Sequence, residues 1–130
     1  TLVAHEYLDY STWRTAPPLP EHEEFVAAVM KSWRETGGEP DVGLDLPRWL
    51  AELEFETLSR RPIVEILSPS DYGWQWPKAF LASGLARLVE LGHVTPRRAA
   101  EMARAFAASE AAPHTLMVTP AVIEIIARRR

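Results

Sequence analysis

The chain has 130 residues, of which 47% are hydrophobic and 25% are charged, proportions typical of one soluble globular domain. It has no cysteine, which excludes disulfides and thiolate metal sites, and no run of about 20 apolar residues that could span a membrane. The net charge of -4 argues against attraction of the whole surface to nucleic acid or anionic lipid. We therefore expect a cytoplasmic protein that binds neither membranes nor nucleic acid.

The first dozen residues, LVAHEYLDYSTW from Leu2 to Trp13, place an apolar run directly before a polar cluster. The run Leu2–Ala4 has no alternation, which is typical of a strand buried on both faces of a parallel sheet. The polar cluster would then lie beyond the carboxyl end of that strand, where open α/β sheets bind ligands. Because the run starts at residue 1 without a turn or cap before it, we expect this chain to be a fragment of a larger sheet.

The segment from residue 11 to residue 67 predicts a loop, two helices and one or two strands. Three prolines between Ser11 and Pro20 favour an extended loop. A helix follows from Glu21 and ends at Gly37-Gly38. A second, short helix starts with Asp45 as its N-cap and carries an apolar face of Trp49, Leu50 and Leu53. Phe55–Leu67 predicts one kinked strand or two short ones at a sheet edge, since it contains Pro62.

The remaining residues predict a helix pair between a loop and a final strand. The loop SPSDYGWQWP, residues 68 to 77, is rich in turn residues. Two helices occupy residues 77 to 109, and the second begins with Thr95 as N-cap and Pro96 at its first position. The run AVIEIIA, Ala121–Ala127, is the last strand, and we expect the three arginines after it to be frayed.

Several of these segments, taken in order, resemble the C-terminal half of a class I S-adenosylmethionine-dependent methyltransferase of the small-molecule type. They are LVAHEYLDYSTW, the helix that ends at Gly37-Gly38, DLPRWLAELEFETLSRRPIVEIL (residues 45 to 67) and TPAVIEIIARRR (residues 119 to 130). The resemblance implies an α/β fold: the C-terminal part of a Rossmann-like sheet of about three strands. Leu2–His5 would be the fifth strand of the family, Phe55–Leu67 the sixth, and Ala121–Ala127 the seventh, antiparallel between the other two. The chain would be a single domain fragment, residues 1 to 130, with residues 77 to 109 as an insertion before the last strand.

The resemblance also implies S-adenosylmethionine as the cofactor. In the family, the glycine-rich loop and the acidic residue that bind it lie in the preceding half of the fold. Neither has a counterpart here, because the only paired glycines end a helix, and no cofactor-binding residue is assigned. We expect the acceptor-side half of an enzyme that methylates a small molecule. It should be inactive alone, and should pair with the N-terminal half or with itself through an open sheet edge.

The candidate site residues are the polar cluster after the first strand and the aromatic residues of the two loops. His5 and Glu6 are the candidates for catalysis, since methyl transfer needs alignment of the acceptor and can need a base near neutral pH. An alternative is that both only form structural hydrogen bonds. Substrate would contact five aromatic residues, with core packing as the alternative for each: Tyr7, Tyr10, Trp13, Trp74 and Trp76.

Three other functions would suit features of the sequence. The first is a binding or oligomerisation module that uses the helix pair and the open sheet edge. The second is DNA binding, because the two helices joined near Gly92 imitate a helix-turn-helix, although the rest of the chain is acidic. The third is metal binding at His5-Glu6 or His22-Glu23, which is disfavoured because adjacent side chains diverge.

Overall fold

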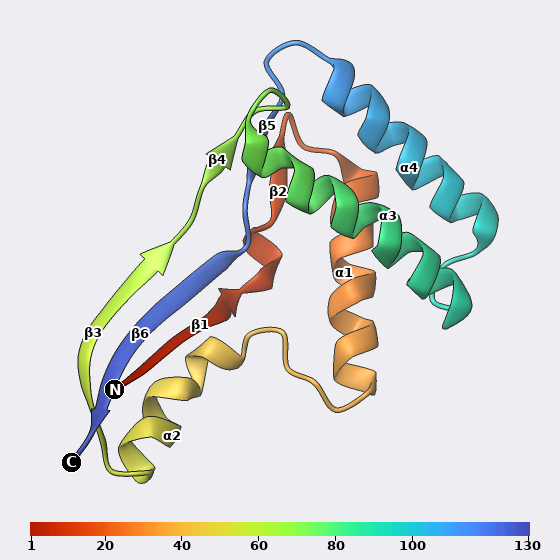
Figure 1. The fold of residues 1–130 in the computed structure, drawn as a ribbon. Helices are drawn as coiled ribbons and strands as arrows, with labels where there is room; N and C mark the ends of the chain where they lie inside the picture. The colour runs from red at the N-terminus through yellow and green to blue at the C-terminus, as the bar shows by residue number, and fades with distance from the viewer.

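The computed structural model describes residues 1–130 and contains two three-stranded antiparallel sheets and four α-helices (Figure 1). The expectation of a mixed α and β structure is confirmed. The helices are α1 (Pro20–Glu35), α2 (Leu46–Glu52), α3 (Gln75–Glu90) and α4 (Pro96–Ala111). The strands are β1 (Leu2–Asp9), β2 (Arg14–Ala16), β3 (Phe55–Ile63), β4 (Ile66–Leu67), β5 (Leu116–Val118) and β6 (Ala121–Arg129). Three single 3-10 turns are η1 (Tyr10–Thr12), η2 (Val42–Leu44) and η3 (Tyr72–Trp74).

The longer sheet, which we call the long sheet, has the strand order β1-β6-β3. The central strand β6 is antiparallel to both neighbours, so β1 and β3 run in the same direction. The sequence of β6, AVIEIIARR, suits this place because apolar β-branched residues favour a central strand. The register puts His5 of β1 and Arg61 of β3 opposite the same residue of β6, Glu124.

The second, short sheet repeats this order with the continuations of the same three segments, β2-β5-β4. β1 leads through η1 into β2, β3 leads into β4, and β5 leads into β6. Figure 1 shows the three segments running side by side from the long sheet, where both termini lie, to the short sheet beside the helices. The two sheets are thus one three-stranded ribbon that changes direction in the middle.

The main core lies between the short sheet and the helices α1, α3 and α4. Its helical residues recur at the spacing of one helix face, such as Phe25, Val26 and Val29 of α1. The predicted end of α1 is confirmed, because Gly37 has a φ of 86° and the Gly38 amide donates to the Trp33 carbonyl over 2.9 Å. The other main-core residues are Tyr10, Trp13, Leu67, Trp74, Leu81, Leu85, Leu88, Val94, Met102, Phe106 and Met117.

The helix pair α3 and α4 stands between β4 and β5, and its start signals are confirmed. Thr95 caps α4, since its Oγ1 accepts a hydrogen bond from the Arg98 amide over 3.1 Å, and Pro96 is the first helical residue. The two helices pack against each other and against α1. The pair therefore belongs to the main core, and Trp76 at the start of α3 reaches the end of the long sheet.

A small second core forms where α2 covers one face of the long sheet. Leu50 of α2 packs against Ile125 and Ala127 of β6. The apolar face predicted for α2 is wrong for its other two members, because Trp49 is 39% exposed and Leu53 is 63% exposed. Leu50 is the one fully buried residue of the short helix, and Leu46 packs beside it partly buried.

Strand β1 differs from its prediction in length and in burial. It extends from Leu2 to Asp9, so the polar cluster lies within the strand instead of beyond it. The cause is pairing with β6, whose register continues to Asp9 opposite Ala121. Leu2 and Val3 are 37% and 58% exposed, so the prediction of burial on both faces is wrong. β1 is an edge strand, and its first residues, Leu2 and Val3, lie outside both cores.

The edge position predicted for the proline-containing strand is confirmed, and residues 55 to 67 form the two strands β3 and β4. The expected fraying after Ala127 is wrong, because Arg128 and Arg129 belong to β6. Arg128 forms an ion pair with Glu56 over 3.1 Å, and the Arg130 amide donates to the Glu54 carbonyl. These contacts extend the β3–β6 pairing to the end of the chain.

Candidate functional site

A cavity of about 350 Å³ opens where the long sheet approaches the start of α3. We call it the Trp76 cavity. Its lining comes from four elements that are distant in sequence, and it includes four of the seven predicted site residues. The lining residues are His5, Glu6 and Tyr7 of β1, Ile63 of β3, Val122 of β6 and Trp76 of α3.

The strand register explains why these residues meet. Tyr7 and Ile63 both lie opposite Val122, so the three residues form a row across three strands. This row is the floor of the cavity. His5 is two residues from Tyr7 and therefore points to the same face of β1. Glu6 points to the other face and borders the cavity only at the strand edge. Of the two residues predicted to act in catalysis, His5 is thus the better placed.

Trp76 forms the roof of the cavity from the second position of α3. Its side chain is 49% exposed, so one part of the ring faces solvent. The ring stacks on buried Trp13 with a centroid distance of 6.4 Å and an interplanar angle of 26°. Stacking against a fixed core residue holds the indole in place while leaving its outer face free for a ligand.

Tyr7 forms one aromatic side of the cavity and also contacts the main core. Its ring meets Tyr10 edge to face, with centroids 4.9 Å apart, and stacks on Trp33 at 6.4 Å. Burial, with a smaller contribution from the Glu6 carboxylate, raises the pKa of the Tyr7 hydroxyl. Tyr7 is therefore a neutral hydroxyl at physiological pH.

His5 contacts the carboxylate of Glu124, and this carboxylate in turn contacts Arg61. Its Nε2 lies 2.8 Å from Oε2 of Glu124, and the Arg61 Nε–H donates to Oε1 of the same carboxylate. Glu124 is 7% exposed. Hydrogen bonds from Arg61 and then His5 lower the pKa of Glu124. The row His5-Glu124-Arg61 thus crosses the sheet directly beside the cavity floor.

Sequence reasoning did not identify Glu124 and Arg61. The single carboxylate inside the apolar run AVIEIIA was a usable signal, because an acidic residue in the middle of a central strand needs a partner. The partners lie 119 and 63 residues away in sequence, so the strand order was needed to find them.

Three predicted substrate residues lie in the core. Tyr10, Trp13 and Trp74 are each 1% exposed. The indole N–H of Trp13 donates to the Met117 sulfur over 3.0 Å, and that of Trp74 donates to Glu110 over 2.7 Å. Their rings stabilise the contact between the helices and the short sheet, which is the packing alternative stated for them. Trp13 supports the site indirectly by stacking on Trp76.

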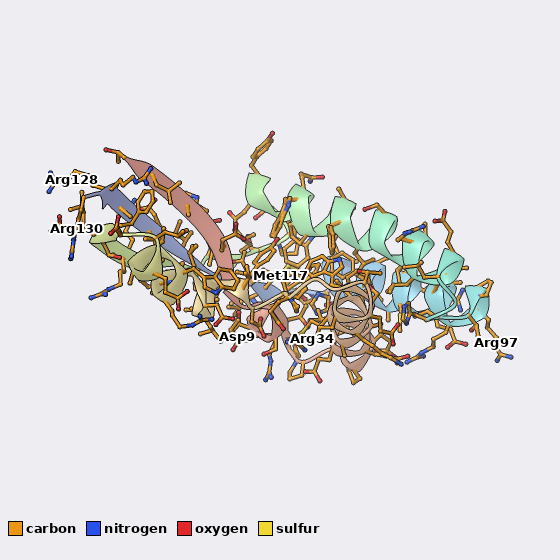
Figure 2. The ribbon with its side chains drawn as sticks, turned by 90° about the horizontal axis from the view of Figure 1, so that it is seen from below. Asp9, Arg34, Arg97, Met117, Arg128 and Arg130 are labelled. Atoms are coloured by element: carbon orange, nitrogen blue, oxygen red, sulfur yellow. The ribbon has the colours of Figure 1, made fainter.

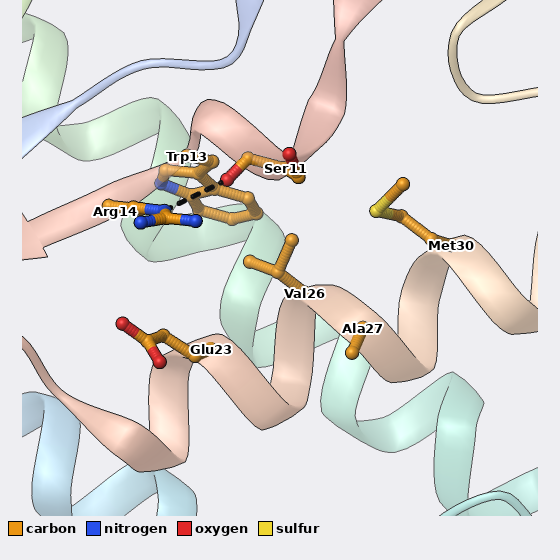
Figure 3. A pocket seen from close by; sticks show the side chains of 7 residues that line it. All are labelled: Ser11, Trp13, Arg14, Glu23, Val26, Ala27 and Met30. Atoms are coloured by element: carbon orange, nitrogen blue, oxygen red, sulfur yellow. Dashed lines mark hydrogen bonds between the residues drawn. The ribbon is translucent and has the colours of Figure 1, made fainter.

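A second, smaller cavity of about 130 Å³ lies on the other side of Trp13, between α1 and the chain before β2 (Figure 3). The one side-chain hydrogen bond among its lining residues joins the Arg14 Nε–H to the Ser11 carbonyl over 3.3 Å. Arg14 and Glu23 both line it but form no ion pair, and its size is that of a few atoms. We therefore place the candidate site at the Trp76 cavity. The lining residues are Ser11, Trp13, Arg14, Glu23, Val26, Ala27 and Met30.

The basic residues of the helix pair are mostly neutralised by acidic neighbours. Arg97 pairs with Glu101, and Arg98 pairs with both Glu24 and Glu101. Figure 2 shows Arg97 at one end of the molecule and Arg128 and Arg130 at the other. Local ion pairs therefore compensate most of the positive charge that a nucleic-acid backbone would need on the helix pair. Lys78 and Arg87 form ion pairs with Glu110 and Glu90.

No group of three or more histidine, aspartate or glutamate side chains is placed to hold a metal ion. None of the helices is long and apolar enough to cross a membrane. Comparison of the chain with protein-family models, with curated proteins and with solved structures finds no match. The function is therefore inferred from the geometry of the long sheet and of the Trp76 cavity.

Proposed function

We propose that this chain is the acceptor-side half of an S-adenosylmethionine-dependent methyltransferase that acts on a small molecule. The Trp76 cavity receives the methyl acceptor. His5 is the base that takes a proton from the accepting atom, and Tyr7 and Trp76 hold the acceptor in place.

The observation that carries this proposal is the order and direction of the strands. The resemblance to the family implies a last strand that runs antiparallel between two strands that are parallel to each other. The long sheet has this arrangement, with β6 between β1 and β3 and antiparallel to both. In chain order, β1, β3 and β6 correspond to the fifth, sixth and seventh strands of the family. The helix α2 lies between the first two of them, as a crossover between parallel strands requires.

The two edges of the long sheet support a partner at β1. The β3 edge contains Pro62 and a register shift between Thr57 and Ser59, and both features discourage a further strand. The outer edge of β1 is regular from Leu2 to Tyr7. We propose that the cofactor-binding half adds its strand parallel to β1 and brings S-adenosylmethionine to the upper end of that strand, beside the Trp76 cavity.

The experiment is calorimetric titration of S-adenosylmethionine into three samples. They are the 130-residue chain alone, a candidate for the proposed cofactor-binding half, and the complex of the two after co-expression. We expect no binding to the chain alone and binding to the complex, with Val3→Lys weakening complex formation. A stable complex that binds no S-adenosylmethionine would contradict the proposal.

The same edge favours a second candidate, an interaction module that forms dimers of this chain. Leu2 and Val3 expose apolar side chains next to the unpaired backbone of β1. Such an edge is a template for a second copy of the strand. In this case the helix pair would serve only to stabilise the ribbon, and no cofactor would bind to any assembly.

A further inference from the structure

We propose that Glu124 is a positioning residue for His5. It keeps the imidazole proton on Nε2 and leaves Nδ1 unprotonated for a group bound in the Trp76 cavity, while Arg61 orients the carboxylate. The use of His5 as a base rests on the proposed methyl transfer. The state of the ring does not, because it follows from the three side chains alone.

The three residues form a row fixed by the backbone. His5 and Arg61 both face Glu124 in the register of the long sheet. The carboxylate is nearly buried, with its side chain 9% exposed, whereas the side chains of His5 and Arg61 are 52% and 67% exposed. Each carboxylate oxygen has one donor, with Oε2 bonded to His5 and Oε1 bonded to Arg61. A strand position cannot be changed without changing the whole register, so this geometry is rigid.

The protonation states follow from the donors. A guanidinium only donates hydrogen bonds, so Oε1 must accept, and the arginine keeps Glu124 ionised. An ionised carboxylate only accepts, so the His5 nitrogen that faces Oε2 must carry a proton. In a neutral imidazole the other nitrogen, Nδ1, then has a free lone pair. His5 Nδ1 has no hydrogen-bond partner within the chain, which leaves it available to a ligand.

Sheet stability alone does not account for this row. On the same face of β6, Glu124 stands between Val122 and Ile126, so an apolar residue would fit the position without the desolvation of a carboxylate. Glu124 forms its two ion pairs with His5 and Arg61, whose side chains are exposed to solvent. Ion pairs with exposed partners contribute little to the free energy of folding. A buried acid that fixes the ring of an exposed histidine is instead the arrangement by which proteins set a histidine tautomer.

The test is the tautomer of His5, measured by long-range ¹H–¹⁵N correlation of the imidazole ring in the 130-residue chain at pH 8. His5→Asn assigns the signals. In the unmodified chain we expect an excess of the Nε2–H form on the order of tenfold, because hydrogen bonds to charged groups are strong. In Glu124→Gln, Arg61 keeps the amide oxygen, so the amide NH₂ faces His5 and donates to Nε2. We expect the excess to reverse toward the Nδ1–H form.

Two further variants separate positioning from general effects on the sheet. Glu124→Asp keeps an ionised acceptor and should keep the Nε2–H form, which provides rescue by a conservative change. Glu56→Gln removes a carboxylate that pairs only with Arg128 on the same sheet and should leave the His5 signals unchanged. Equal populations of the two tautomers in the unmodified chain, or a Glu124→Gln spectrum identical to it, would overturn the proposal. If the methyltransferase proposal is wrong, the complex will not bind S-adenosylmethionine, whereas the spectra of His5 will still be as expected.

Discussion

His22 is a buried histidine whose two ring nitrogens have no hydrogen-bond partner. It is 1% exposed and is surrounded by aromatic rings, with Trp13 edge-on at 4.8 Å and Phe106 stacked at 6.2 Å. Burial lowers the pKa of His22 to about 4. The fold therefore requires the neutral ring, whereas the unfolded chain binds a proton at an ordinary pKa of 6.5.

This difference predicts a loss of stability in mild acid. Between pH 6.5 and pH 4.5 the unfolded state binds the proton and the folded state does not, so the free energy of unfolding should fall by about 2 kcal/mol. Urea unfolding at a series of pH values measures the loss. His22→Leu should remove the decrease and, since it also removes two unsatisfied polar atoms, should not destabilise the chain at pH 7. An equal decrease in His22→Leu would contradict this assignment. Other carboxylates have lowered pKa values, so they lose their contributions to the free energy of unfolding only at more acidic pH. They include Glu24, Glu101, Glu110 and Glu124.

At the scale of elements, η2 supports β1 through direct contact at a glycine. A Cβ atom placed on Gly43 would lie 2.6 Å from the Tyr7 carbonyl oxygen and 2.9 Å from Cγ2 of Ile123. Only a residue without a side chain lets the segment before α2 approach the strand that carries His5 and Tyr7. The contact therefore helps to position one wall of the Trp76 cavity.

Gly43→Ala should push η2 away from β1 and lower the free energy of unfolding by about 2 kcal/mol, the usual effect of overpacking. Denaturant unfolding measures the loss, and the amide signals of Tyr7 and Ile123 should shift. Gly37→Ala is a useful control, because Gly37 has a positive φ and no neighbour within 4 Å. It should cost about 1 kcal/mol through backbone strain alone and leave those signals in place. Equal spectral changes in both variants would argue against the contact.

The elements that sequence reasoning predicted well are those specified by neighbouring residues. Thr95 and Pro96 start α4, and Gly37 ends α1, through contacts within one helical turn. The length of β1 and the exposure of Trp49 were predicted wrongly, because each depends on which partner the element meets. The candidate site divides in the same way. His5, Tyr7 and Trp76 share one cavity, and their roles in a site stay a prediction, whereas Glu124 and Arg61 depend on strand order across more than 60 residues.

At the scale of the whole molecule, the long sheet has one edge, at β3, that is protected against pairing with a further strand, and one edge, at β1, that is not. We expect the chain to associate weakly with itself through β1 as its concentration rises. Sedimentation velocity over a range of concentrations measures this. Val3→Lys, which places a charge at the open edge, should reduce association, and Leu58→Lys on the β3 edge should not. A chain that remains monomeric at high concentration would contradict the edge argument.

The proposed binding of a methyl acceptor in the Trp76 cavity can be tested by following the transfer of an isotopically labelled methyl group. The complex with the candidate cofactor-binding half is incubated with S-adenosylmethionine labelled in its methyl group and with an extract of small molecules. We predict labelled small molecules, a decrease of about 100-fold or more in His5→Asn, and no decrease in His114→Asn, an exposed histidine that does not line the cavity. Absence of labelled product from a complex that binds S-adenosylmethionine, or equal transfer by His5→Asn, would contradict the account.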